Sequence, residues 1–325
     1  MTSVLVTGSS GLIGSAIAQH LSSDGDVRLR RLVRDGRSCA AGDVCGDLRD
    51  AVSVRRAMDG VDVLVHAASY TGPDPALAWG VNETGTRVLV DAAHAAGVRR
   101  IVSISTAAVY GPGPHLNVVE GRLSSNPVSE VSRSRLAGET HVREAGGYVL
   151  RPNFVSGARD RAFIPGLVAL FASLGAWVDN GAAHISTIDS CDLARLTAAF
   201  ALGPAITGPR IVHVNHPQPI SIRYLLNAIE QRFRVPAPER SITCEEAFAI
   251  ASRPEFPFTK RQVSLVTLDH TYDSMRAWRA TGLVPTAPFP IRAESSSWYG
   301  ATLGQYAPGL ADWHGSRQVS YESMG

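Results

Sequence analysis

The sequence predicts an α/β protein in which helices cover both faces of a doubly wound parallel sheet and a smaller C-terminal cap covers the ends of its strands. Short β-branched runs alternate with helical segments through the first half of the chain, which is the pattern of successive βαβ units. A glycine-rich turn follows the first of these runs directly. The alternation weakens after Pro152, and 325 residues with 45% hydrophobic content suffice for one large core and a smaller one.

The predicted sheet contains six strands along the chain. They are expected at Val4–Thr7, Val27–Arg34, Val61–His66, Arg100–Ser103, Tyr148–Arg151 and Ile211–Asn215. Helices are expected at Leu12–Ser22, Ala76–Ala96 and Val131–Glu144. The second helix ends at Gly97, a residue type that often follows the last turn of a helix.

The same pattern predicts two discontinuous domains. Residues 1–155 and 188–215 are expected to form the sheet domain, and residues 156–187 and 216–325 the cap. Ligands bind outside the carboxyl ends of the strands in such sheets. The cap is therefore expected to enclose a binding site.

Charge and hydropathy exclude several function classes. The net charge of +2 is small and the arginines are scattered, so we expect neither a nucleic acid partner nor an anionic membrane partner. The N-terminal "MTSVLVTG" lacks a basic segment and a long apolar segment, which argues against a signal peptide. The apolar run Phe163–Val178 is interrupted by proline and glycine, so a buried helix is expected there rather than a membrane span.

The four cysteines give no sign of a metal or disulfide framework. Cys39, Cys45, Cys191 and Cys244 have neither metal-ligand spacing nor a pairing pattern. We therefore expect four free thiols, no metal site and a cytoplasmic location, where thiols stay reduced.

The motif "VLVTGSSGLIGSAIAQHL" places three glycines between the first strand and the first helix. Gly8 permits a tight turn, Gly11 lets the backbone approach a pyrophosphate, and Gly14 lets the helix pack close to the strand. Phosphates would then lie at the helix N-terminus. This context predicts a Rossmann-type dinucleotide site, and the alternative is a structural glycine-rich turn.

The end of the second strand distinguishes NADP from NAD. An arginine there accommodates a 2′-phosphate, whereas an acidic residue binds the ribose hydroxyls. Arg34 is the predicted last residue and Arg37 is a second candidate, so NADPH is favoured. NADH stays the alternative, because a shift of one residue would put Asp35 at this position. A solvated strand edge without a cofactor role is the third interpretation.

Further motifs resemble those of the extended short-chain dehydrogenase/reductase family, which includes nucleotide-sugar epimerases and dehydratases. They are "TGSSGLIG", "GDLRD", "VLVHAAS", "VNETGTRVLVDAA", "IVSISTAAVYG", "YVLRPNFVSG" and "STIDSCDLARL". The resemblance implies a nicotinamide dinucleotide cofactor and contacts to it from Ser10, Leu12, Ile13, Asp47, Leu48, Ala67, Ala68, Ser69, Pro152, Asn153 and Val155. It also implies a homodimer formed through Glu83–Ala96 and Val131–Glu144.

The catalytic residues of that family are matched only in part. Thr106 stands at the Ser/Thr position that polarises the carbonyl, and Ser105 is a candidate to share this role. Val131 stands where the family has its proton-donating tyrosine, and Arg135 where it has its lysine. Val131 has no ionisable proton, whereas Arg135 can still hold ribose hydroxyls but cannot shuttle a proton. Arginine for lysine is weak evidence of lost function here, because Lys260 is the only lysine.

Hydride transfer can survive the loss of the tyrosine if a proton comes from elsewhere. General acid catalysis contributes about 10²–10⁴-fold, whereas alignment of the reactants contributes about 7–11 kcal/mol. Three proton sources are open: another side chain, a water molecule or the substrate. Tyr70 and His115 are the candidate side chains, both expected in loops at the ligand edge, and the alternative is that they only line the cap.

The substrate route suits a ketone with a neighbouring phenol, because the phenol can protonate the nascent alkoxide. Val131 would then offer an apolar surface to a flat aromatic ring. We therefore expect an NADPH-dependent ketoreductase acting on a small-molecule aromatic ketone of the polycyclic polyketide class, in antibiotic biosynthesis. The alternatives are a catalytically silent NADP-binding regulator and a nucleotide-sugar epimerase or dehydratase.

Overall fold

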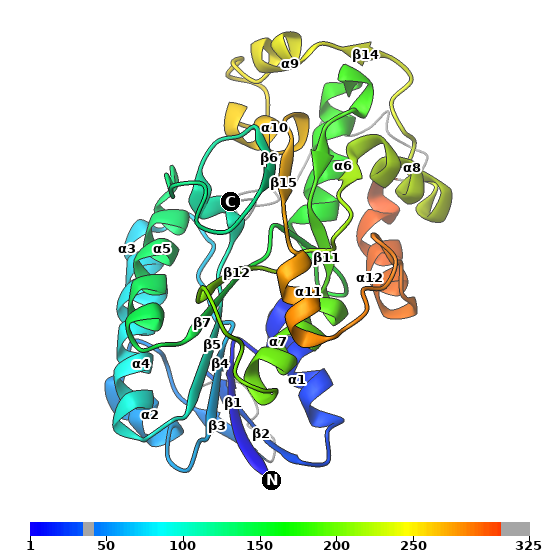
Figure 1. The fold of residues 1–325 in the computed structure, drawn as a ribbon. Helices are drawn as coiled ribbons and strands as arrows, with labels where there is room; N and C mark the ends of the chain where they lie inside the picture. The colour runs from blue at the N-terminus through cyan, green and yellow to red at the C-terminus, as the bar shows by residue number, and fades with distance from the viewer. Residues whose placement is uncertain (35–41, 307–325) are drawn as a thin grey trace.

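A parallel sheet of seven strands forms the centre of one half of the molecule in the computed structural model, which describes residues 1–34 and 42–306 (Figure 1). The strands are β1 (Thr2–Thr7), β2 (Val27–Val33), β3 (Asp43–Cys45), β4 (Val63–His66), β5 (Arg100–Ile104), β7 (Tyr148–Arg151) and β12 (Ile211–His213). Their order is β12-β7-β5-β4-β1-β2-β3, so the chain winds outward in both directions from the β1/β4 pair. Ligands bind at this kind of reversal point in doubly wound sheets.

Helices cover both faces of the sheet, as predicted (Figure 1). One face carries α1 (Leu12–Ser22), α7 (Ser190–Leu202) and α11 (Met275–Thr281). The other face carries α2 (Ala51–Ala57), α4 (Thr86–Ala95) and α5 (Glu130–Glu144). The strand β1 shows why, because Val4 and Val6 join the apolar cluster of the first face and Leu5 that of the second. This is the side-chain alternation of a strand buried on both sides.

The cap lies beyond the C-terminal ends of the strands (Figure 1). Its helices are α6 (Phe163–Leu174), α8 (Ile222–Phe233), α9 (Cys244–Ile250), α10 (Lys260–Thr267) and α12 (Ala293–Leu303). Its short strands are β6 (His115–Val118), β8 (Phe154–Ser156), β9 (Trp177–Val178), β10 (His184–Ile185), β11 (Thr187–Asp189), β13 (Ile220–Ser221), β14 (Ser241–Ile242) and β15 (His270–Tyr272). The short 3₁₀ segments are η2 (Ala107–Tyr110), η3 (Asp179–Gly181) and η4 (Gly304–Tyr306). A separate apolar cluster centred on α6 forms the core of the cap.

The expected fold class is confirmed, and the expected strands and helices are present with ends shifted by at most two residues. One difference is the helix expected at Ala76–Ala96, which consists of α3 (Pro75–Ala78), a π-helical turn η1 (Trp79–Gly85) and α4. Within η1, the Asn82 side chain accepts hydrogen bonds from the Tyr70 amide and the Ser69 hydroxyl, at 2.8 and 3.0 Å. Through Asn82, the π-helical turn fixes the position of Ser69 and Tyr70 after β4. Single π-helical turns often occur at functional sites.

Two expectations about individual segments need correction or qualification, and two elements were not expected. His115 does not lie in a loop, because His115–Val118 form β6, which pairs with β15 from far along the chain. The segments β3 and α2 were not expected from the sequence. The domain boundaries stay a prediction, and α11, from the segment assigned to the cap, packs on α7 and β12 of the sheet domain.

The thiol expectation is wrong at one position. Cys45 takes part in a disulfide, whereas Cys191 and Cys244 are free. Cys39 lies outside the described residues, as do Asp35 and Arg37.

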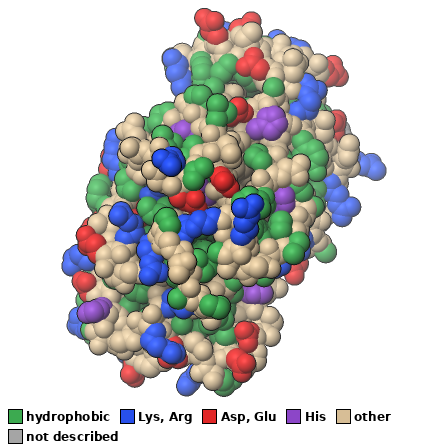
Figure 2. Space-filling view, viewed as in Figure 1, with side chains coloured by type: hydrophobic (Ala, Val, Ile, Leu, Met, Phe, Trp, Pro, Cys, Tyr) green, Lys and Arg blue, Asp and Glu red, His purple; other side chains and the backbone are tan. Residues whose placement is uncertain are grey.

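In residues 1–34 and 42–306, no helix combines the length and the apolar character needed to cross a membrane. On the face shown in Figure 2, acidic and basic side chains are interspersed.

Candidate active site

The glycine-rich turn forms a tight cradle at the start of α1. Gly8 has a φ of +73°, and a Cβ there would lie 2.6 Å from the carbonyl oxygen of Ala67. A Cβ on Gly14 would lie 2.2 Å from the carbonyl oxygen of Gly8. Only glycine fits both positions. The N-cap of α1 is Gly11, without a side-chain cap, so the first backbone N–H groups stay open to an anion.

Two adjoining cavities meet at this turn. Their volumes are about 470 and 820 Å³, and Ser10, Gly11, Ala67 and Ser69 line both. The smaller cavity is also lined by Gly8, Arg34, Asp47, Leu48 and Ala68, and the larger by Leu12, Ile13, Gly14, Arg135, Asn153 and Val155. Every residue expected to bind the cofactor therefore borders one of them except Pro152, whose carbonyl instead accepts the Ala107 amide. The cradle and cavities fit an extended dinucleotide.

Arg34 lies directly after β2, one residue beyond the observed end of the strand. It borders the smaller cavity together with Asp47. Hydrogen bonds from Arg49 hold the pKa of Asp47 below its usual range, and the charge of Arg34 acts in the same direction. Asp47 is bonded to Arg49, and Arg34 forms no ion pair within residues 1–34 and 42–306.

Thr106 and Ser105 have different surroundings although they are neighbours. Thr106 lines the larger cavity, and its Oγ1 accepts a hydrogen bond from the Ala108 amide at 3.1 Å. Among the described residues its hydroxyl proton has no acceptor, so it can be donated to a ligand. Ser105 does not line that cavity, because its hydroxyl is buried and donates to Glu139. The geometry favours Thr106 alone as a contact to a reacting oxygen.

Val131 and Arg135 lie one turn apart near the start of α5. The N-cap Ser129 and Ser132 form a reciprocal capping box that fixes this end of the helix. Val131 is buried at 9% exposure and does not line the larger cavity. Arg135 does line it and donates to the Ile104 carbonyl at 3.2 Å. Burial lowers the pKa of Arg135 to about 10, although the charge of Glu139 opposes this shift.

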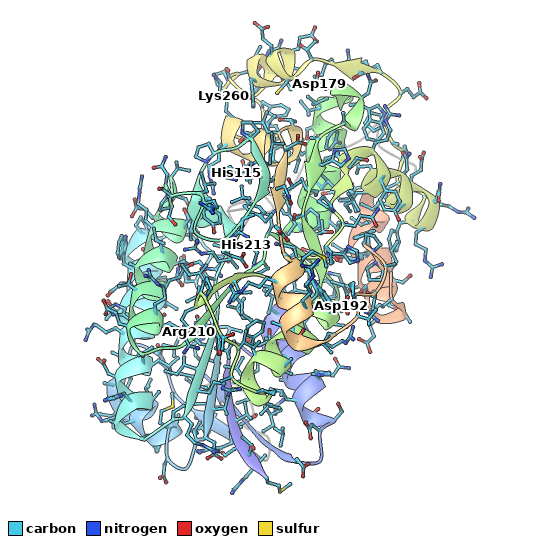
Figure 3. All side chains as sticks on the ribbon, in the orientation of Figure 1. His115, Asp179, Asp192, Arg210, His213 and Lys260 are labelled. Carbon is cyan, nitrogen blue, oxygen red and sulfur yellow. The ribbon has the colours of Figure 1, made fainter. Side chains whose placement is uncertain are left out.

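Tyr70 and His115, the side chains considered as proton donors, do not line the larger cavity. Tyr70 borders the smaller one, and its hydroxyl accepts from the Asp74 amide at 3.2 Å. His115 is buried, and its Nδ1 lies 2.7 Å from the Tyr272 hydroxyl. Figure 3 labels His115 on β6 of the cap, above His213 at the end of β12. His115 thus contacts Tyr272, which does line the larger cavity.

Two residues of β15 that were not expected at the site, His270 and Tyr272, border the larger cavity. Burial lowers the pKa of His270 to about 4 and raises the pKa of Tyr272 above its usual value. The ring of Tyr272 stacks on the ring of Tyr110, with 5.7 Å between the ring centroids. No local sequence pattern could have placed them here, because β15 reaches the site through its pairing with β6 and β10.

Arg159 is the third unexpected residue. It has a φ of +77°, a region that favours glycine, and its guanidinium donates to the Ser10 carbonyl at 3.0 Å. The next residue, Asp160, is buried and accepts backbone N–H groups of the first turn of α6. Asp160 thus anchors this segment while Arg159 reaches over the glycine turn.

Comparisons with known proteins agree with this geometry. The sequence model of the family described as NAD dependent epimerase/dehydratase family matches residues 4–204. The chain is 30% identical over 264 residues to the 4-hydroxy-2-methyl-3-oxo-4-farnesyl-3,4-dihydroquinoline-1-oxide ketoreductase of Stigmatella aurantiaca, covering 76% of this chain and 78% of that protein. It is 26% identical over 317 residues to the 2-alkyl-3-oxoalkanoate reductase of Stenotrophomonas maltophilia, covering 87% and 94% respectively. The solved structure of Bordetella bronchiseptica WbmH in complex with NAD+ shares the fold, with a TM-score of 0.69 at 22% identity over 94% of this chain and 99% of that one.

Proposed function

This chain belongs to the NAD-dependent epimerase/dehydratase family, and we propose that it is an NADPH-dependent ketoreductase for a ketone on a bulky polycyclic aromatic polyketide. The observation that carries this proposal is a cavity of about 820 Å³ lined by Thr106 and Arg135. Val131, which does not line it, stands at the position of the family's tyrosine. The two relatives described above are named as reductases of ketone substrates, and one of those ketones is a farnesylated dihydroquinoline oxide.

In this proposal the residues of the two cavities bind different parts of the cofactor and the substrate. A nicotinamide dinucleotide, when bound, supplies the hydride. The glycine turn and the open end of α1 hold its phosphates, and Arg34 pairs with the 2′-phosphate. Arg135 binds the ribose next to the nicotinamide, with Asn153 and Val155 beside it. The free hydroxyl proton of Thr106 hydrogen-bonds the ketone oxygen and orients it for attack.

The proton comes from the substrate itself in this proposal. A hydroxyl peri to the ketone is already hydrogen-bonded to its oxygen. When the hydride adds to the carbonyl carbon, this phenol passes its proton to the nascent alkoxide and becomes a delocalised phenolate. A protein acid at the position of Val131 is then unnecessary.

The Val131/Arg135 pair also resembles the angucyclinone ketoreductase of simocyclinone biosynthesis. This resemblance supports an angucyclinone-like substrate, a role in antibiotic biosynthesis and a cytoplasmic location. The helices α4 and α5 pack side by side on one face of the sheet, and we propose that they form a homodimer interface.

Steady-state NADPH oxidation with a panel of peri-hydroxylated polycyclic ketones tests the proposal. Turnover with formation of the secondary alcohol is expected. Tight NADPH binding without turnover of any ketone would favour the silent regulatory protein.

The family description favours the epimerase or dehydratase as a second candidate. Binding of a nucleotide sugar, measured by calorimetry, would support it, although Val131 cannot remove a hydroxyl proton.

The substitution Arg34→Gln is expected to weaken NADPH binding by about 10- to 100-fold, because it removes a charge-assisted bond to the 2′-phosphate. The dissociation constant of NADH, which lacks this phosphate, should not change. Both constants can be measured by fluorescence titration. Equal weakening of NADPH and NADH would show that Arg34 does not read the 2′-phosphate.

The substitution Arg159→Gln is expected to weaken the binding of ADP-ribose by about tenfold or more, because Arg159 lies over the glycine turn where a pyrophosphate would be held. Adenosine 2′-monophosphate carries no phosphate at the 5′ position, so its affinity should be unchanged. Arg55→Gln is the control, because Arg55 is an exposed arginine on α2 that lines neither of the two cavities. Loss of affinity for both ligands would contradict the assignment.

A further inference from the structure

Arg135 is a cation without an anionic partner in the described part of the chain. Its guanidinium has five N–H donors, but within the described residues it makes a single hydrogen bond, to the Ile104 carbonyl. No carboxylate lies within ion-pair distance of it in residues 1–34 and 42–306. A partly buried charge is costly unless it is paired. The surroundings of Arg135 therefore leave its charge to be balanced by a ligand.

The groups around Arg135 explain why its charge stays unbalanced. Glu139, the nearest carboxylate on α5, is held by two hydrogen bonds from Arg151 and one from Ser105. His66, on the neighbouring strand β4, is bonded to Thr7 and Thr86 through its two ring nitrogens. Burial, and then the charge of Arg135, lower the pKa of His66 to about 4, so the ring is neutral near pH 7. Neither group supplies a free negative charge.

The position of Arg135 selects which ligand can supply the anion. The side chain lies at the end of β5, where Ile104 receives its hydrogen bond and Thr106 borders the same cavity. The ribose that Arg135 is proposed to hold is neutral. The phosphates are proposed to lie at the start of α1, which follows β1 and not β5. The remaining occupant of this region is the reacting end of the substrate.

We propose that Arg135 pairs directly with the anion formed on the substrate during reduction and stabilises it. This inference rests on the proposed ketoreductase function. Hydride adds to the carbonyl carbon, the former carbonyl oxygen takes the proton of the peri-hydroxyl, and the phenolate that remains is bound by the guanidinium. The phenolate then takes a proton from water when the product leaves. The planar guanidinium presents separate edges, so one can contact ribose while another contacts the phenolate.

The pKa of a bound phenol measures this contact without any turnover. The probe is 1,8-dihydroxyanthraquinone, a polycyclic peri-hydroxy ketone whose phenolate absorbs at longer wavelength than its phenol, bound in the presence of saturating NADP+. Its absorbance is titrated with pH in the wild type and in Arg135→Gln. The pKa of the bound phenol should be lower in the wild type by about 1 to 3 pH units, because an adjacent opposite charge favours the ionised form.

Two further variants separate charge, shape and fold. Arg135→Lys keeps the charge but not the planar fork, and should retain part of the pKa difference. Arg133→Gln removes a cation from the exposed face of the same helix, where Arg133 pairs with Glu130, and should titrate like the wild type. The melting temperature and far-UV circular dichroism of each variant show that it is folded, and the NADP+ concentration is raised until each variant is saturated.

The outcomes distinguish this inference from the proposed function. Turnover of Arg135→Gln should fall by about 10²–10³-fold, the usual cost of removing a group that stabilises an oxyanion. Identical phenol titrations in the wild type and Arg135→Gln, with normal wild-type turnover, would overturn the role of Arg135 alone. A wild-type protein that binds NADPH but reduces no ketone would overturn the proposed function.

Discussion

Methylation of the peri-hydroxyl of the substrate is expected to reduce kcat/KM by about 10²–10⁴-fold, which is the usual contribution of a positioned proton donor. The reason is that Val131 cannot donate a proton, so the nascent alkoxide depends on the phenol. The measurement compares NADPH oxidation with matched pairs of polycyclic ketones that differ only in the methyl group. The methyl ether is the smallest ether that blocks the proton, and the cavity of about 820 Å³ leaves room for one added methyl group. The comparison therefore reports mainly on the proton and less on steric fit.

Tyr272 is the side chain in the described structure that competes best with the substrate as proton source. It borders the cavity, and its hydroxyl lies 2.7 Å from His115 Nδ1, which can carry a proton. Burial raises its pKa, so it is protonated near pH 7. The Tyr272→Phe variant should keep most of the turnover of the free phenol. Equal turnover of phenol and methyl ether, with loss of both in Tyr272→Phe, would transfer the role of acid to this tyrosine.

The sequence was sufficient for those parts of the site that depend on neighbours along the chain. The spacing of Gly8, Gly11 and Gly14 predicted a turn in which added Cβ atoms would clash at two of the three positions. The expected positions of Thr106 and Arg135 follow from the end of β5 and the start of α5. These features need only a strand, a turn and a helix in succession.

The rest of the site depends on partners that lie far apart in sequence. His270 and Tyr272 reach the cavity because β15 pairs with β6, and neither strand has a strong local pattern. Arg159 reaches the glycine turn through a backbone conformation unusual for arginine. Ser105 was expected at the site beside Thr106, but strand alternation turns it to the opposite side, where Glu139 accepts its hydrogen bond.

Glu139 and Arg151 form a buried ion pair whose disruption should have the largest effect on stability. Their side chains are 2% and 3% exposed, and Arg151 Nε donates to Glu139 Oε1 at 3.0 Å. Removing one partner leaves the other charge buried and unpaired, which costs about 3–5 kcal/mol. Glu139→Gln keeps the volume and removes the charge. Its free energy of unfolding, from urea denaturation, should fall by this amount.

An exposed ion pair on the same helix provides the control. Glu130 pairs with Arg133 at the surface, so Glu130→Gln should cost at most about 1 kcal/mol. The double variant Glu139→Leu/Arg151→Met should be more stable than Glu139→Gln, because it removes both charges instead of leaving one. If Glu139→Gln were no more destabilised than Glu130→Gln, the pair would not be desolvated as its burial indicates.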